Sequence, residues 1–297
     1  MIRKLKYKEI DFEKYQECIK NSEQYSVFAE KKYLDTLIGN HWDVLVCNDY
    51  QAVMPVPFVG KFGFKFVVMP FQTQQLGIFS KHDNELLNEE FFRFFQKNYN
   101  IYYYAFNHNN KFVSYLNYRF NYRLIKDNYE NVRKRYSIHR RRNVRITEFL
   151  ESKFTFVETK DLSNEKKFFI DNAIGASKKD FKFFFDNMIK LNAANFLKVF
   201  NLYFEDTLAS QAYLVNAENE YLLVNFINDK KFLKYNSSSI ILDYIFQKSI
   251  SNKNFNFHGS MISSIANFYK RFGAIEEKYP IIQNSKKELV KKIFIKS

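Results

Sequence analysis

The chain has 297 residues, 46% of them hydrophobic, and this supply of apolar side chains predicts two domains of ordinary size and excludes a disordered chain. Its 46 Lys and Arg residues outnumber its 32 Asp and Glu residues, and the net charge of +14 attracts polyanions such as RNA, anionic lipid surfaces or phosphorylated small molecules. A codon bias toward lysine explains the excess equally well, so composition alone does not identify a partner.

The first part of the chain predicts a domain in which helices lie beside strands. A first helix is expected at about 11–20, and Ser26 is a suitable N-cap for a second helix that Gly39 ends. Pro55 and Pro57 fall inside an alternating strand, where they remove ladder donors and so require an edge or a bulge. The other expected elements are strands at 42–47, 51–58, 66–69, 101–106 and 118–125 and a helix at 84–97.

Seven cations are concentrated between Arg133 and Arg145. At ~100° per residue they cover about 200° of a helix, which predicts a mainly solvent-facing helix connecting the domains at about 128–150. Arg140, Arg141 and Arg142 are candidates for binding a phosphorylated donor, because the planar guanidinium group clamps phosphate through two donors. The alternative is a solvated charged helix without a ligand.

The remainder of the chain, 151–297, predicts a second domain with a regular order of elements. Its apolar periodicity indicates a strand, two helices, three antiparallel strands, a helix, a strand, a helix and a last strand. The segment 221–226 is nearly continuous apolar sequence, as in a strand that is covered on both faces. The expected elements lie at 154–157, 164–173, 179–191, 196–204, 210–215, 221–227, about 240–248, 255–257, 265–272 and 274–280.

The most informative motif lies near the end of the chain. Residues 256–260, Asn-Phe-His-Gly-Ser, read as the end of a short strand and a turn that can cap the next helix, which Gly273 ends. With the strands of 42–69 and the polar turn 70–77, this layout resembles the Fem-type aminoacyltransferases, a branch of the GNAT acyltransferase superfamily. The resemblance implies an α/β (α+β) fold of two tandem GNAT-like domains, 1–127 and 151–297, each a mixed, mostly antiparallel sheet flanked by helices.

The resemblance also implies an activity: transfer of an aminoacyl or acyl group to an amine, for example on a cell-wall or peptide precursor. The activated donor is then aminoacyl-tRNA or acyl-CoA, with no tightly bound cofactor. The closing helix of the family commonly reads Phe-Lys-x-x-Phe-Gly, whereas this chain has Tyr269 at the lysine position and Lys270 directly after it. Both are catalytic candidates, together with His258, because a tyrosine can donate to an oxyanion and an imidazole can accept a proton from an amine.

Three further sets of residues are candidates for binding. Gln72, Gln74 and Gln75 form an uncharged polar turn suited to amide groups of a substrate, or a plain loop, and Tyr213 is a further substrate-binding candidate. Ser237, Ser238 and Ser239 open a helix whose N-terminus suits the phosphates of a donor, although serines there also serve simply as caps.

Other classes of protein are excluded or set aside. With only 7 glycines, no pair is spaced as a P-loop or dinucleotide motif requires. Cys18 and Cys47 are far apart and no Cys/His spacing fits zinc, so we expect no metal and no structural disulfide. The charged N-terminus and the lack of a long apolar run predict a cytoplasmic protein. The alternative function is a catalytically inactive GNAT-like protein that binds RNA or a phosphorylated glycan through its basic helix.

Overall fold

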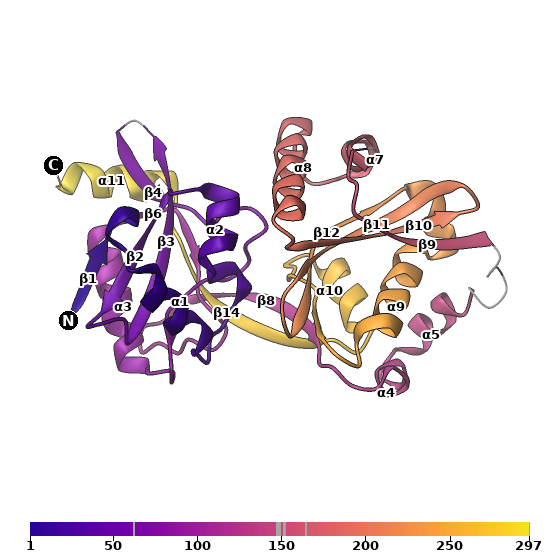
Figure 1. Ribbon diagram of the computed structural model, residues 1–297, viewed down its shortest axis with the longest axis horizontal. Helices are drawn as coiled ribbons and strands as arrows, with labels where there is room; N and C mark the ends of the chain where they lie inside the picture. The colour runs from indigo at the N-terminus through magenta and orange to yellow at the C-terminus, as the bar shows by residue number, and fades with distance from the viewer. Residues whose placement is uncertain (62, 147–149, 151–152, 164, 297) are drawn as a thin grey trace. The chain divides into compact units, whose positions relative to one another are not determined.

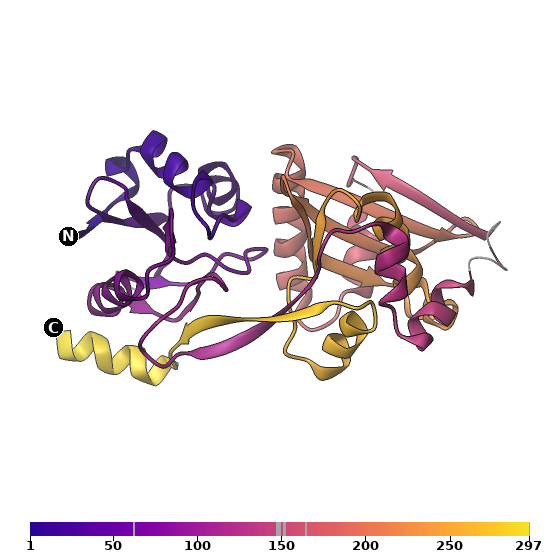
Figure 2. The ribbon, with the colours of Figure 1, turned by 90° about the horizontal axis from the view of Figure 1, so that it is seen from below.

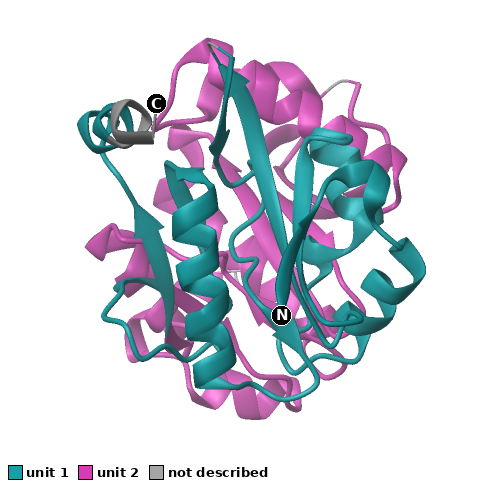
Figure 3. Ribbon diagram, turned by 90° about the vertical axis from the view of Figure 1, so that its left-hand side faces the viewer, with its two compact units in different colours: residues 1–120, 278–297 teal, residues 121–277 magenta. Residues whose placement is uncertain are grey.

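The computed structural model describes residues 1–61, 63–146, 150, 153–163 and 165–296. The chain forms two compact units, and unit 1 is discontinuous: residues 1–120 and 278–297 form unit 1, and residues 121–277 form unit 2 (Figure 3). Residues 278–297, which the order of elements predicts as part of the second domain, are grouped with unit 1. The expected connecting segment 128–150 falls within unit 2, except that 147–149 lie outside the described residues.

Unit 1 places its helices beside a mixed sheet. In that sheet the strand order is β1-β2-β3-β4-β6, with β5 paired to β3, and all pairs are antiparallel except β4 with β6. The strands of this sheet are β1 (Ile2–Leu5), β2 (Trp42–Cys47), β3 (Ala52–Lys61), β4 (Phe64–Val67), β5 (Phe79–Ser80) and β6 (Asn100–Ile101), and β7 (Tyr103–Ala105) belongs to the second, larger sheet. The helices are η1 (Tyr7–Glu9), α1 (Phe12–Lys20), η2 (Val27–Ala29), α2 (Lys31–Ile38), α3 (Glu85–Asn98) and α11 (Lys286–Lys296).

The helix boundaries follow local capping chemistry. Asp11 caps α1 by accepting from the backbone N–H groups of Glu13 and Lys14, and α1 agrees with the helix expected at about 11–20. The second expected helix is divided, because Ser26 caps only the short helix η2 and Glu30 then takes an extended conformation before α2 begins. Gly39 ends α2 with a positive φ of 59°.

The two prolines of β3 occupy a local edge inside a central strand. On the side away from β2, β5 pairs only with Ala52 and Val53, and β4 pairs only with Phe58–Lys61. The carbonyl groups of Pro55 and Pro57 point to that side, where they accept from the Tyr104 hydroxyl and the Val68 N–H. The missing N–H of each proline therefore faces a gap in the ladder and leaves no ladder bond unmade.

Unit 2 has the order of elements that the sequence predicts. From β9 onward it runs strand, two helices, three antiparallel strands, helix, strand, helix and strand. The strands are β9 (Phe154–Thr159), β10 (Leu197–Phe204), β11 (Thr207–Asn216), β12 (Glu220–Asn228) and β13 (Asn254–Asn256), with β8 (Asn117–Leu124) and β14 (Ile275–Gln283) shared with unit 1. The helices are α4 (Tyr129–Lys134), α5 (Ile138–Val144), α7 (Glu165–Asn172), α8 (Lys178–Ala193), η4 (Lys230–Tyr235), α9 (Ser237–Ser249) and α10 (Ser263–Lys270).

The large sheet has the strand order β7-β14-β8-β13-β12-β11-β10-β9, and β8 and β14 run side by side as long strands (Figure 2). Helices α7 and α8 cover one face of its unit 2 part, and α9 and α10 cover the other face (Figure 1). Side chains confirm this division, because Phe169 of α7 packs on Tyr213, whereas Phe246 of α9 packs on Phe255. None of the described helices is long and apolar enough to cross a membrane.

The basic segment forms two short helices instead of one. Helix α4 ends at Lys134, and Ser137 starts α5 by accepting from the backbone N–H of Arg140. Arg141 and Arg142 are exposed, as predicted, but Arg140 is buried with only 1% of its surface accessible. Arg140 is therefore an exception to the expected, mainly solvent-facing segment, because its side chain turns inward toward α9 and α10.

Candidate functional site

A pocket of about 430 Å³ lies on the α7–α8 side of unit 2. Its walls come from the end of α7, the turn into α8, the last residues of β12 and the helix η4 that follows. Aromatic and aliphatic side chains dominate the lining, and Ile174 and Leu233 are exposed although both are apolar. The apolar lining residues include Phe169, Ile174, Phe181, Phe184, Ile227 and Leu233. Such a lining suits the apolar part of a small ligand.

The end of β12 forms the polar part of this pocket. Strand β13 runs parallel to β12 but pairs only with Glu220–Leu222, so the rest of β12 continues past its partner. Asn225 lies in that continuation and lines the pocket, and its side-chain Nδ2 is buried without a hydrogen-bond partner among the described residues. A donor of this kind can bind a carbonyl oxygen of a ligand, which repays the desolvation of the amide.

Tyr213 lies beneath the pocket and does not line it. It is fully buried opposite Asn225 in the β11–β12 ladder, and its ring contacts Phe169 edge-on at 5.5 Å. Its hydroxyl donates to Gln211 Oε1 at 3.0 Å, and burial raises its pKa well above the usual range. Gln211 in turn donates to Glu165 of α7, so a buried hydrogen-bond network joins the sheet to that helix. Tyr213 therefore supports the pocket floor.

The three serines at the start of α9 point in different directions. Ser238 donates to Asn228 Oδ1 at 2.8 Å, and Asn228 lines the pocket. Ser239 is buried and accepts from Arg140, while the Ser237 hydroxyl is buried without a hydrogen-bond partner among the described residues. Ser238 thus bonds to a pocket residue without lining the pocket itself, whereas its two neighbours face the interior.

Arg140 joins three helices of unit 2. From α5, its guanidinium group donates to Ser239 in α9 and, at 3.0 Å, to the carbonyl oxygen of Phe268 in α10. The same group lies 4.2 Å from the ring centroid of Phe268 and 3.9 Å from that of Phe272. Burial lowers its pKa to about 10, so the side chain remains a cation at neutral pH.

The three catalytic candidates lie in and after the closing turn of unit 2. Tyr269 is buried and stacks on Phe257 with ring centroids 4.3 Å apart, and burial raises its pKa to about 12. Lys270 points outward to an ion pair with Glu276 at 2.7 Å, which raises its pKa. His258 follows β13 with a positive φ of 61°, and burial lowers its pKa to about 4, so its ring is neutral at pH 7.

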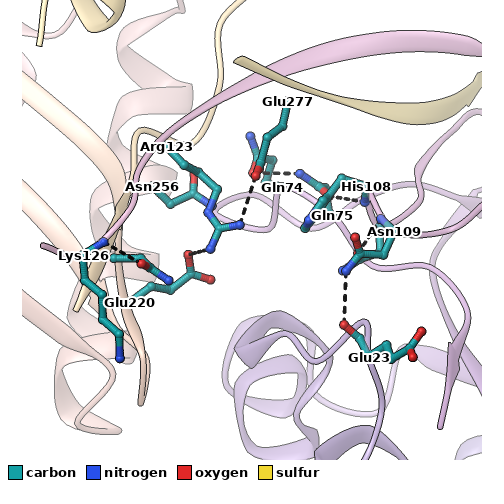
Figure 4. Close-up of polar contacts among 12 residues, drawn as sticks. Glu23, Gln74, Gln75, His108, Asn109, Arg123, Lys126, Glu220, Asn256 and Glu277 are labelled. Atoms are coloured by element: carbon teal, nitrogen blue, oxygen red, sulfur yellow. Dashed lines mark hydrogen bonds and ion pairs between the residues drawn. The ribbon is translucent and has the colours of Figure 1, made fainter. Parts of the chain in front are cut away.

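The glutamine turn belongs to unit 1 and is buried there. Gln75 donates to Gln74 Oε1 at 3.2 Å and accepts from the backbone N–H of His108 at 2.8 Å (Figure 4). Gln72 has a positive φ of 60°, and its carbonyl oxygen accepts from the Tyr33 hydroxyl at 2.6 Å. These bonds hold the turn in one conformation.

The sequence analysis does not predict a role for Asn225 or for the turn between α7 and α8. Asn225 is a polar residue inside an otherwise apolar strand, and this was a signal that could have identified it.

No protein-family model matches the sequence, and no curated protein matches it. Solved structures do show the fold. FemX aligns with a TM-score of 0.63 at 10% identity, covering 93% of this chain and 96% of that chain. The C-terminal domain of a putative lysylphosphatidylglycerol synthetase from Agrobacterium fabrum aligns with a TM-score of 0.51 at 10% identity, covering 96% of each chain. A tandem GNAT protein from the clavulanic acid biosynthesis pathway gives 0.50 at 7% identity, covering 95% of this chain and 97% of that chain.

These likenesses define the fold class. The chain has a two-domain fold similar to those of FemX and of the tandem GNAT protein, with mixed sheets flanked by helices. The resemblance drawn from residues 42–77 and 256–274 is thus confirmed at the level of the fold. Donor, acceptor and site residues are matters of chemistry that fold similarity does not assign.

Proposed function

We propose that the protein transfers an acyl or aminoacyl group from an activated donor to an amine, and that the unit 2 pocket holds the group being transferred. The pocket, bounded by α7, α8 and the end of β12, is the observation that carries this proposal. Its apolar walls suit an acyl chain or an apolar amino-acid side chain, and the Asn225 amide suits the carbonyl oxygen of the same group. Aminoacyl-tRNA and acyl-CoA are both donors that present such a group.

The remaining candidates stay proposed, and none of them is among the residues that line the unit 2 pocket. Acyl transfer develops negative charge on the carbonyl oxygen, and a fixed amide donor such as that of Asn225 stabilises it. Tyr269, with its raised pKa, is protonated at neutral pH and can act as a hydrogen-bond donor. Neutral His258 can accept a proton, and Lys270 is proposed only as a cation near the closing turn. Gln72, Gln74 and Gln75 remain proposed contacts for the acceptor, as does Tyr213 through the floor it supports.

Filling the pocket tests the proposal. Ala173 lines the pocket, and Ala173→Phe places a ring inside it; Ala193→Phe, at the exposed end of α8, is the matched control. Thermal melting with hexanoyl-CoA, free CoA, aminoacylated tRNA and deacylated tRNA identifies the donor, because a ligand that binds the folded state raises the melting temperature. We expect an acylated form to stabilise the wild type and the Ala193 variant more than its deacylated form, and to lose this advantage in Ala173→Phe. Equal stabilisation by acylated and deacylated forms contradicts the proposal.

A second candidate function is supported by the exposed cations of α4 and α5. Lys134, Arg141 and Arg142 are exposed and form no ion pair with any described residue. This surface suits RNA or a phosphorylated glycan, and a protein without catalytic activity would still bind through it. If the protein is an acyltransferase, the same cations bind the phosphates of the donor, and Ser238 is a further proposed contact. Arg140, Ser237 and Ser239 are buried, so we do not propose direct contacts between them and the phosphates.

A further inference from the structure

Four neighbouring strands of unit 2 carry a row of polar side chains on one face of the sheet. The strands β14, β8, β13 and β12 contribute Glu277, Arg123, Asn256 and Glu220, in that order. Arg123 lies directly opposite Asn256 in the β8–β13 ladder, and residues paired in this way share a face. Because Phe255 faces α9, its neighbour Asn256 faces the α7–α8 side, and the row faces that side with it.

Arg123 bridges the two carboxylates of this row (Figure 4). Its Nη1 lies 3.1 Å from Glu277 Oε1, and its Nη2 lies 3.6 Å from Glu220 Oε2, which is an ion-pair distance and too long for a hydrogen bond. The three side chains keep only 17%, 20% and 24% of their surface exposed for Arg123, Glu277 and Glu220 respectively. One guanidinium therefore faces two carboxylates in a partly desolvated place.

This bridge leaves hydrogen-bonding capacity unused. Arg123 Nε, Glu220 Oε2 and Glu277 Oε2 are shielded from solvent, and none has a hydrogen-bond partner among the described residues. When both carboxylates are ionised, the cluster also carries an excess of one negative charge. Burial raises the pKa of Glu220, and the charge of Glu277 raises it further, while Arg123 and Asn256 lower it. A cationic donor placed here compensates the charge and supplies hydrogen bonds to the two carboxylate oxygens that lack them.

We propose that Glu220 and Glu277, bridged by Arg123, bind the primary ammonium group of a substrate. The free Nε–H of Arg123 then binds an oxygen of the same molecule, so the best-matched ligand carries an ammonium group near a carbonyl, as an α-amino amide does. This ammonium subsite goes beyond the proposed transfer site, because Glu220 precedes Asn225 by five residues on β12, roughly 16 Å along an extended strand, so the bound ammonium is not the amine that attacks a carbonyl held by Asn225. The neighbouring Glu276 is not part of it, since that side chain faces the opposite side and pairs with Tyr122 and Lys270.

Binding of L-alaninamide to the full chain tests the subsite without any knowledge of the donor. With ¹⁵N-labelled arginine, the Nε–H resonance of Arg123 is identified by its loss in Arg123→Lys, and it then reports ligand binding directly. At pH 6.5, where the amine is protonated, we expect L-alaninamide to shift this resonance saturably. N-acetyl-L-alaninamide, which lacks the ammonium group, should not shift it.

Two variants and one control decide the assignment. Glu277→Gln and Glu220→Gln should each weaken alaninamide binding by about tenfold or more, because each removes a charge partner of the ammonium group. Glu276→Gln should bind as the wild type does. If one of the two variants fails to fold by circular dichroism, the other carries the test. A missing saturable shift, an equal shift by the acetylated probe, or an unchanged affinity in the folded variants overturns the proposal. If alaninamide binds through Glu220 but the protein has no transferase activity, the proposed function is rejected and the proposed ammonium subsite is supported.

Discussion

At the scale of the residue, Arg140 shows how a side chain expected at the surface becomes part of the interior. Its guanidinium group is the point at which α5, α9 and α10 meet, with a carbonyl, a hydroxyl and two aromatic rings around it. Removing it breaks charge-assisted hydrogen bonds and opens a void at the same time. Arg141, one residue later, is exposed and makes no such contact with any residue that the structure describes.

Arg140→Ala should therefore destabilise the protein by about 3 kcal/mol or more, since hydrogen bonds to charged groups contribute ~1.5–3 kcal/mol each and the rings lose their cation. Arg141→Ala should change the free energy of unfolding by less than about 0.5 kcal/mol, as is usual for an exposed residue. Urea unfolding of the two variants measures the difference. Equal stabilities would show that the contacts of Arg140 contribute nothing net.

His258 gives the fold a pH dependence. Burial lowers its pKa in the folded state to about 4, while the unfolded chain has the ordinary value of about 6.5, so protonation favours unfolding. The stabilisation is complete above pH 6.5 and is lost as the pH falls toward 4. In His258→Asn, a residue that tolerates the positive φ, the loss between these pH values should be smaller than in the wild type by about 1–3 kcal/mol. Urea unfolding at several pH values measures both slopes, and identical slopes would contradict a neutral His258 side chain in the folded state.

At the scale of the element, α4 and α5 separate the roles of neighbouring cations. The break at Arg135–Ser137 lets α5 turn Arg140 inward while Arg141 and Arg142 stay in solvent. The periodicity of the sequence predicts one helix for this segment, because periodicity does not detect an N-cap residue inside a run of charged residues. Ser137 supplies that cap.

Binding of deacylated tRNA should depend steeply on salt if this surface binds polyanions. Each phosphate contact contributes roughly 0.7 to 0.9 to the slope of log affinity against log salt concentration, so Arg141→Ala with Arg142→Ala should reduce the slope by about 1.5. Lys8→Ala with Lys20→Ala, which removes two exposed cations of unit 1, is the control and should change the slope less. Salt-independent binding, or an equal effect of both pairs, would reject a specific role for α5.

At the scale of the whole molecule, unit 1 depends on the end of the chain. Strand β14 pairs with β7 through Ile281, Ile282 and Gln283, and the carbonyl oxygen of Pro280 accepts from the Phe106 N–H at 2.9 Å. Ile281 and Ile282 are buried. A fragment that stops at residue 277 therefore exposes the edge of β7 and loses part of the core of unit 1.

In the fragment 1–277, unit 1 should unfold at a clearly lower temperature than in the full chain. In the fragment 1–284, which keeps β14 and lacks α11, the melting temperature of unit 1 should fall less. Trp42 is the only tryptophan and is buried in unit 1, so its fluorescence reports that unit alone. Melting curves of the two fragments followed by this signal measure the effect. Equal melting temperatures for 1–277 and the full chain would show that unit 1 is stable without β14.

The amino-acid sequence by itself determined the order of elements in unit 2, the first helix at about 11–20, the Gly39 stop and the resemblance that the FemX-like fold confirms. These features depend on neighbours within a few residues, where periodicity and capping act. Only the tertiary structure decided the inward turn of Arg140, the pocket around Asn225 and the row that joins Arg123 to Glu220 and Glu277. Their members lie on different elements far apart in the chain, and strand order and register, which no local pattern encodes, bring them into contact.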